Sequence, residues 1–203
     1  MTDIKQCMRE ILAAESKAVA AIPVSDGYDN AVKLIVEHVW NRHGKLITSG
    51  MGKAGQIAMN IATTFSSTGI PSVFLHPSEA QHGDLGVMQD NDVMLLLSNS
   101  GKTREILELV MLAKRMKNDL RIIVITGNAD SELARIADVT LWTGGSPEVC
   151  PLGLTPTTST TLIGDVLVVN VMRTTGFTKE MYAMRHHGGY LGKVSRGEEK
   201  GDK

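Results

Sequence analysis

Residues 45–56 read KLITSGMGKAGQ. A short apolar run at 46–48 breaks into a glycine-rich turn at 50–55, and a segment of helical period follows. A buried strand, a tight turn and a helix in this order open a βαβ unit. The turn has the spacing G-x-G-x-x-G, which is a hint of a dinucleotide site. However, Lys53 lies inside it, so the ligand could instead be the phosphate of a smaller molecule.

The same alternation continues along the chain. Further short runs that are apolar almost throughout are expected to be strands buried on both faces, as in a parallel sheet: 73–75, 93–97, 122–125 and 139–142. Segments of helical period are 4–22, a second helix capped by Ser25-Asp26, 54–67, 105–116, 131–137, 158–174 and 178–184. We therefore predict an α/β fold, a doubly wound, Rossmann-like parallel sheet of about five strands flanked by helices.

Length and charge narrow the class of protein. The 203 residues carry 21 Lys and Arg against 22 Asp and Glu, a net charge of −1, so we expect no nucleic-acid partner. The apolar runs are too short to span a bilayer, and the first residues lack a signal-peptide core, so we expect no membrane partner. Two distant cysteines indicate a reducing compartment. We expect one soluble, cytoplasmic domain over 1–203, with a flexible tail from about 193.

A second turn, 98–103, follows the third predicted strand and reads SNSGKT. Small residues at the start of a helix let backbone N–H groups approach an anion, and the hydroxyl groups add donors. A dinucleotide-binding fold has an acidic residue at the end of the next strand, where it binds the ribose. Here that strand ends in His76-Pro77, and Glu79 lies beyond the proline. The Walker pattern also fails, because Ala54 follows Lys53 where Ser or Thr is needed. A phosphate is thus favoured over NAD, while glycines that merely shape the turn remain the plain alternative.

Titratable residues gather in three more stretches, 76–86 (HPSEAQHGDLG), 147–161 (PEVCPLGLTPTTSTT) and 185–192 (RHHGGYLG). His76 and His82 could bind a metal, but no zinc-protease motif or second ligand pair accompanies them. Cys150 could be a nucleophile, although a buried structural thiol is the better reading. Glu105 sits where an acid favours a helix N-terminus, and Glu148 follows the last strand. From the residues alone, structural roles for both remain open.

Together these stretches resemble one family. GMGKAG, HPSEAQHGDLG, SNSGKTREI, CPLGLTPT and RHHGGYLG are similar to the sugar isomerase (SIS) domain of arabinose 5-phosphate isomerases, over about residues 4–193. These enzymes begin the synthesis of 3-deoxy-D-manno-octulosonate (Kdo), a lipopolysaccharide sugar. The resemblance implies a usually tetrameric α/β protein that interconverts ribulose 5-phosphate and arabinose 5-phosphate. It implies no organic cofactor and no required metal, although zinc can inhibit.

The family's catalytic positions fall on four residues of this chain. They are the lysine of GMGK (Lys53), the glutamate of the SNSGKTREI stretch (Glu105), the glutamate shortly before CPLG (Glu148) and the late histidine (His186). His76 and His82 match the histidines of HPSEAQH and are where inhibitory zinc would bind. The resemblance assigns substrate binding to residues of the two turns and to two further histidines: Gly52, His82, Ser98, Asn99, Ser100, Gly101, Thr103 and His187.

Aldose–ketose isomerisation needs a base beside the substrate carbons and a donor for the enediol oxyanion. We expect proton transfer by Glu148 or His186, oxyanion stabilisation by Lys53, and substrate orientation by Glu105 and His82. In SIS proteins the late histidine often reaches into a neighbouring subunit, so we expect a homotetramer.

Two features depart from the family pattern. His187 replaces the usual proline after the late histidine, so either ring could be active. We expect no paired CBS modules after the SIS domain, and feedback by a later Kdo-pathway product would then partly replace their regulation. A sensing module without turnover, an isomerase of another sugar phosphate and an NAD enzyme remain alternatives.

Overall fold

The computed structural model describes residues 3–145, 148 and 152–198. Its centre is a five-stranded sheet in which every pairing is parallel and the strand order is β2-β1-β3-β4-β5. The strands are β1 (Leu46–Gly50), β2 (Ser72–Phe74), β3 (Val93–Leu97), β4 (Arg121–Thr126) and β5 (Val139–Trp142). The predicted fold class is therefore confirmed, and this strand order is one of the two common doubly wound orders.

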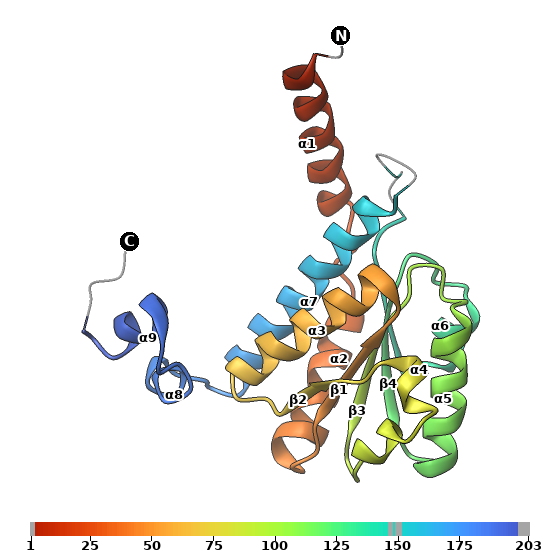
Figure 1. The fold of residues 1–203 in the computed structure, drawn as a ribbon, viewed down its shortest axis with the longest axis vertical. Helices are drawn as coiled ribbons and strands as arrows, with labels where there is room; N and C mark the ends of the chain where they lie inside the picture. Colours follow the sequence, from red (N-terminus) through yellow and green to blue (C-terminus); the bar gives the residue numbers. More distant parts are fainter. Residues whose placement is uncertain (1–2, 146–147, 149–151, 199–203) are drawn as a thin grey trace.

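Helices cover both faces of the sheet (Figure 1). One face carries α2 (Gly27–Ile35), α3 (Gly52–Ser67) and α7 (Leu154–Thr174). The other carries α4 (Pro77–Ala80), η2 (Asp84–Val87), α5 (Arg104–Met116) and α6 (Glu132–Ile136). A π-helix, η1 (Val36–Asn41), follows α2 directly.

Two parts project from this layered body (Figure 1). The long N-terminal helix α1 (Ile4–Ala20) meets the body at its C-terminal end. At the other end of the chain, α8 (Lys179–Ala183) and α9 (Gly189–Ser195) form a small unit beyond the end of α7, which we call the arm (residues 178–198). Residues 193–195, which we expected in a flexible tail, belong to α9, and 199–203 lie outside the described residues.

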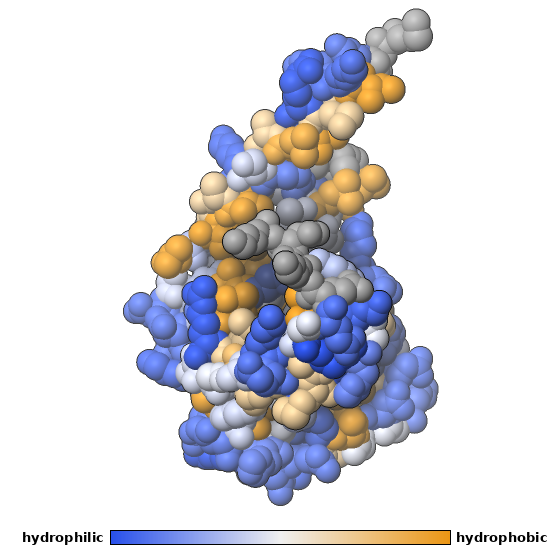
Figure 2. All heavy atoms as spheres, turned by 90° about the vertical axis from the view of Figure 1, so that its left-hand side faces the viewer, coloured by the Kyte–Doolittle hydropathy of each residue, from blue (hydrophilic) through white to orange (hydrophobic). Residues whose placement is uncertain are grey.

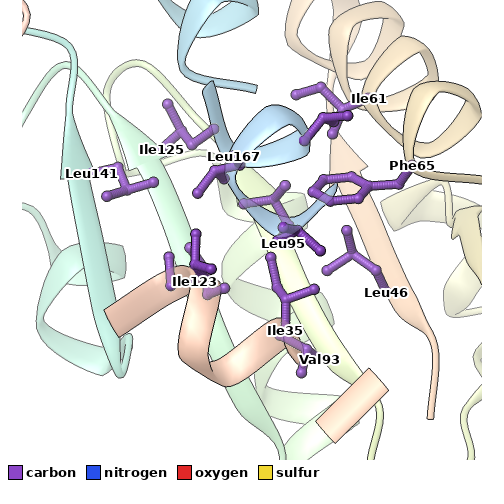
Figure 3. Packing of buried hydrophobic residues seen from close by; sticks show 14 of the residues in the cluster. Ile35, Leu46, Ile61, Phe65, Val93, Leu95, Ile123, Ile125, Leu141 and Leu167 are labelled. Atoms are coloured by element: carbon purple, nitrogen blue, oxygen red, sulfur yellow. The ribbon is translucent and has the colours of Figure 1, made fainter. Parts of the chain in front are cut away.

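Successive side chains of the strands point to opposite faces of the sheet and belong to two separate hydrophobic cores. Leu46, Leu95 and Ile123 pack against Ile35, Phe65 and Leu167 of the covering helices (Figure 3). The intervening residues, such as Ile47 and Leu96, pack against Ile106 and Leu109 of α5. Every residue of β1 and β3 is buried, which explains why β3 is a continuous apolar run.

The apolar stretches of the helices are short. Among the described residues, no helix combines the length and apolar character that crossing a membrane requires.

Candidate functional site

The candidate site lies where the strand order reverses. β1 and β3 are neighbours, but the chain leaves β1 toward β2 and returns on the opposite side, so their carboxyl ends flank a switch point. A hollow of about 340 Å³ opens there. Five predicted site residues line it, together with residues from the start of α7: Lys53, Ser98, Asn99, Ser100, Thr103, Gly153 and Pro156. Residues of the two glycine-containing turns thus line one hollow.

The first turn is built on close backbone contact between β1 and α3. A Cβ on Gly55 would lie 2.6 Å from the carbonyl oxygen of Gly50, so no larger residue fits without moving the helix. Gly50 and Gly55 therefore shape the turn, which is the structural role that the sequence offered as an alternative to ligand binding. The turn also presents Lys53 from the first residues of α3, and its ammonium group donates to the carbonyl of Leu152, just before α7.

The second turn is held by its own hydroxyl groups. Ser98 is buried, its Oγ lies 2.8 Å from Thr103 Oγ1, and it accepts the N–H of Gly101 at 3.2 Å. Gly101 has a φ of +61°, and a Cβ there would lie 2.0 Å from Ser131 Oγ. Asn99 and Ser100 are exposed at the tip of the turn. Ser98 therefore shapes the loop, while Asn99 and Ser100 present exposed side chains at its tip, where Ser100 Oγ also accepts the N–H of Lys102 at 3.2 Å.

Glu148 lies in a second hollow beside the first. This hollow, of about 230 Å³, shares Asn99 and Pro156 with the first one. The Glu148 Oε1 atom accepts the backbone N–H groups of Leu154 at 2.8 Å and Thr155 at 3.1 Å. A carboxylate there satisfies free donors and faces the positive end of the 21-residue α7. Glu148 is thus fixed by this cap, next to Lys53 and the second turn.

Glu15 also belongs to this region, although no motif in the sequence marks it. It extends from α1, and its Oε1 accepts the Thr155 hydroxyl group at 2.8 Å. Its Oε2 is enclosed and has no hydrogen-bond partner within the described structure. Thr155 therefore joins two carboxylates, those of Glu15 and Glu148, at the start of α7.

Glu105 and His82 lie outside both hollows. Glu105 is half-buried in the first turn of α5. His82 is exposed between α4 and η2. The structure thus does not bring these two predicted residues to the lining of either hollow.

His76 has a structural role. Its Nδ1 atom accepts the N–H of Ser78 at 3.3 Å as the N-cap of α4, and its ring meets the edge of Phe74. Across residues 3–145, 148 and 152–198, no three His, Cys, Asp or Glu residues gather as metal ligands would. Cys150, the candidate nucleophile, lies outside the described residues.

The two later histidines differ in environment. The His186 ring stacks on Tyr182 with 3.6 Å between ring centroids and 10° between ring planes. Arg196 donates to the backbone carbonyls of His186 at 3.0 Å and His187 at 3.3 Å. The His187 residue is exposed, whereas His186 is half-buried. Of the two, His186 is the one whose ring is held in place.

Within one chain, His186 does not lie near Lys53. A Cβ on Gly69, just beyond the end of α3, would lie 3.2 Å from Arg185 of the arm. Lys53 lies at the start of the same helix, whose 16 residues span about 24 Å. The arm lies beyond the C-terminal end of α3 (Figure 1), whereas the hollow that contains Lys53 lies at the start of this helix. The sequence motifs assigned His186 and Lys53 to one site, but they could not give the distance between the two residues.

Two ring-bearing side chains outside the candidate site, His38 and Tyr28, have a shifted pKa. Burial, followed by the positive charges of Arg42 and Arg121, lowers the pKa of His38 in η1. Burial raises the pKa of the Tyr28 hydroxyl group in α2.

A switch-point hollow lined by a lysine and a serine-rich turn is an arrangement in which α/β proteins commonly bind phosphate groups. The SIS domain family matches residues 38–195, and the chain belongs to that family. The arabinose 5-phosphate isomerase KdsD of Shigella flexneri is 44% identical over 94% of this chain. The chain spans 58% of the length of that curated relative.

Solved structures agree with this placement. A candidate phosphosugar isomerase involved in capsule formation in Bacteroides fragilis is 62% identical, with a TM-score of 0.90. The match covers 92% of this chain and 99% of that one. A protein of E. coli CFT073, solved in complex with arabinose 5-phosphate, is 32% identical with a TM-score of 0.82. That match covers 92% of this chain and 100% of the other.

Proposed function

We propose that this chain is an aldose–ketose isomerase that interconverts D-ribulose 5-phosphate and D-arabinose 5-phosphate. The observation that carries the proposal is the shared hollow, in which Lys53 faces the turn of residues 98–103 at the switch point. The identity to arabinose 5-phosphate isomerases supports the choice of substrate, as does the related protein solved with arabinose 5-phosphate. The cytoplasmic location and the place at the start of Kdo synthesis belong to the same proposal.

The substrate phosphate fits the second turn best. Asn99 and Ser100 are exposed there, and the turn leads into the 13-residue α5, whose N-terminus favours an anion. Binding the phosphate at this remote end positions the carbonyl end of the sugar, so binding energy is used to orient the reacting atoms.

The chemistry then needs a base and a cation. A base removes a proton from C1 of ribulose 5-phosphate, and the electron pair moves to form a 1,2-enediolate whose negative oxygen lies near the Lys53 ammonium group. Return of the proton to C2, together with transfer of the O1 hydroxyl proton to the oxygen on C2, gives the aldose. Glu148 and His186 are the candidate bases. Glu105 and His82 lie outside the hollow, so their orienting role requires that the site closes on the substrate.

The position of His186 makes a second copy of the chain part of the proposal. Because His186 and Lys53 lie at opposite ends of α3 in one chain, an active site that uses both takes His186 from a neighbouring subunit. A homotetramer, the assembly expected from the family, would supply it. Full activity in a monomeric form would contradict this arrangement.

The test is to incubate the protein with ribulose 5-phosphate and EDTA and to follow arabinose 5-phosphate by NMR. We expect turnover by the wild type, a loss of about 10²–10³-fold in kcat for Lys53→Met, and wild-type rates for Lys33→Met. Lys33 is a matched control because it is an exposed lysine on α2, away from both hollows. Bound ligand without turnover would instead support a sensing module. Turnover of a different sugar phosphate alone would correct the substrate.

A further inference from the structure

The contacts of His186 determine which of its ring nitrogens carries the proton. The Nδ1 atom lies 3.0 Å from the backbone carbonyl oxygen of Tyr182. A carbonyl oxygen can only accept a hydrogen bond, so Nδ1 is the protonated nitrogen at this distance. In neutral imidazole the other nitrogen, Nε2, then holds the free lone pair.

The Tyr182 ring fixes the plane of this imidazole. The two rings are one helical turn apart and stack nearly parallel, 3.6 Å between centroids. The same carbonyl of Tyr182 also accepts the backbone N–H of His186 at 3.1 Å. The Arg196 side chain bonds the carbonyl of His186 from the far side of the loop. Backbone, ring plane and tautomer of His186 are therefore all held within the arm.

Building on the function proposed above, we propose that Tyr182 is a positioning residue that holds His186 in the Nδ1–H tautomer and presents Nε2 as the base of the isomerisation. Nε2 takes the proton from C1 of the ketose as the enediolate forms, and the ring becomes imidazolium. Nε2 then returns the proton to C2, the hydroxyl proton of O1 passes to the oxygen on C2, and the neutral imidazole is restored. The Nδ1–H group stays bonded to the Tyr182 carbonyl throughout, which stabilises the positive charge of the intermediate state.

The choice of His186 over His187 follows from the same contacts. Both histidines follow α8, and the sequence alone left either ring as a candidate. The His187 residue is exposed, and its ring takes part in none of the stacking or hydrogen bonds that hold His186. A base must meet the substrate carbon in one orientation, so a ring that is already held loses less freedom on reaction.

The direct test is ¹⁵N NMR of the assembled wild-type protein labelled at histidine, recorded at a pH where the rings are neutral. His186→Asn identifies the His186 signals. We expect a protonated Nδ1 and an unprotonated Nε2. A protonated Nε2, or an even mixture of the two tautomers, overturns the inference. This readout needs no substrate, so it is independent of whether the isomerase proposal holds.

Kinetics test the positioning role of Tyr182. Tyr182→Leu removes the stacked ring but keeps the backbone carbonyl, so we expect kcat to fall about 10-fold with KM within about twofold. Tyr182→Phe keeps the stack and should rescue kcat. Met184→Ala is the matched control, because Met184 is an exposed apolar residue of the same arm. Wild-type kcat in Tyr182→Leu would overturn the positioning role. If the wild type itself does not isomerise the sugar while the tautomer is as expected, the proposed function has failed and the ring assignment stands.

Discussion

The carboxyl edge of the sheet and the C-terminal arm are built in opposite ways. At the edge, Lys53 and the second turn each follow a fully buried strand, and glycines of the two turns lie too close to neighbouring atoms for a side chain to fit. In the arm, α8 has no buried residue, and its main partner is α9 (Figure 1). The chain thus holds its lysine and its second turn with its own core, but leaves the histidine proposed as base on an element with little core of its own.

The difference between the sheet edge and the arm suggests a role for the proposed homotetramer. Apolar side chains along α1 are exposed as well, and they appear as hydrophobic patches at the top of Figure 2: Ile4, Met8, Ile11 and Leu12. An extended helix and an arm that each pack little against the body of their own chain are what a shared site would require. In this account, binding is local to the chain, whereas proton transfer depends on a second copy.

The largest expected effect separates activity from stability in the arm. His186→Ala should lower kcat about 10³-fold, because it removes a general base. The free energy of unfolding should change by less than about 0.5 kcal/mol, because the side chain is only half-buried on an element outside the core. Steady-state kinetics and urea unfolding measure the two. A variant that unfolds easily would show that the arm supports the fold.

The opposite pattern is expected in the body. Leu95→Ala, in the centre of β3, should lower the free energy of unfolding by about 3 kcal/mol, because Leu95 is fully buried between α2, α3 and α7. Chemical denaturation measures the loss, with Met184→Ala in the arm as the control. If both variants lost the same stability, the contrast between body and arm would be wrong.

A smaller effect should show that the second turn binds rather than reacts. Ser98→Ala removes the hydroxyl group that bonds Thr103 and accepts the Gly101 N–H, so the loop loses its shape. We expect KM for the sugar phosphate to rise about fivefold with kcat nearly unchanged. Ser66→Ala, an exposed hydroxyl on α3, is the control. A fall in kcat at constant KM would instead place Ser98 in the chemistry.

The smallest effect concerns the pH dependence of the body. The pKa of His38 is lowered in the folded chain, first by burial and then by Arg42 and Arg121. The unfolded chain therefore binds more protons as pH falls through about 6.5, so stability decreases on acidification. Wild type should lose more stability than His38→Gln between about pH 7.5 and 5.5, as thermal unfolding can measure. Equal losses in the two proteins would show that His38 does not contribute to the pH dependence of stability.

The sequence predicted the body well because burial leaves a pattern. Runs 93–97 and 139–142 match β3 and β5 residue for residue. In β3 the run is apolar because both faces of the strand are buried. The boundaries predicted from the sequence are wrong where contacts with residues outside the element determine where a helix begins. The last helix of the body begins at Leu154 rather than 158, because Glu148 caps it. The short α4, η2 and α9 lack the length at which a helical period is visible.

The site was predicted in parts. Small polar turns after strands predicted where the first hollow lies, because parallel strands bring their carboxyl ends together. The role of Glu15 could not be read from the sequence, since it depends on how α1 meets Thr155. The distance between His186 and Lys53 depends on where the arm folds, and no local pattern encodes that.

The most direct test of the shared site is to mix two inactive variants, Lys53→Met and His186→Ala, by refolding them together at equal amounts. Each variant alone should be nearly inactive. If the site combines Lys53 of one chain with His186 of another, about a quarter of the sites in random assemblies are intact and should restore a matching share of turnover. Mixed assemblies that form, as native mass spectrometry would show, but stay inactive would contradict the account.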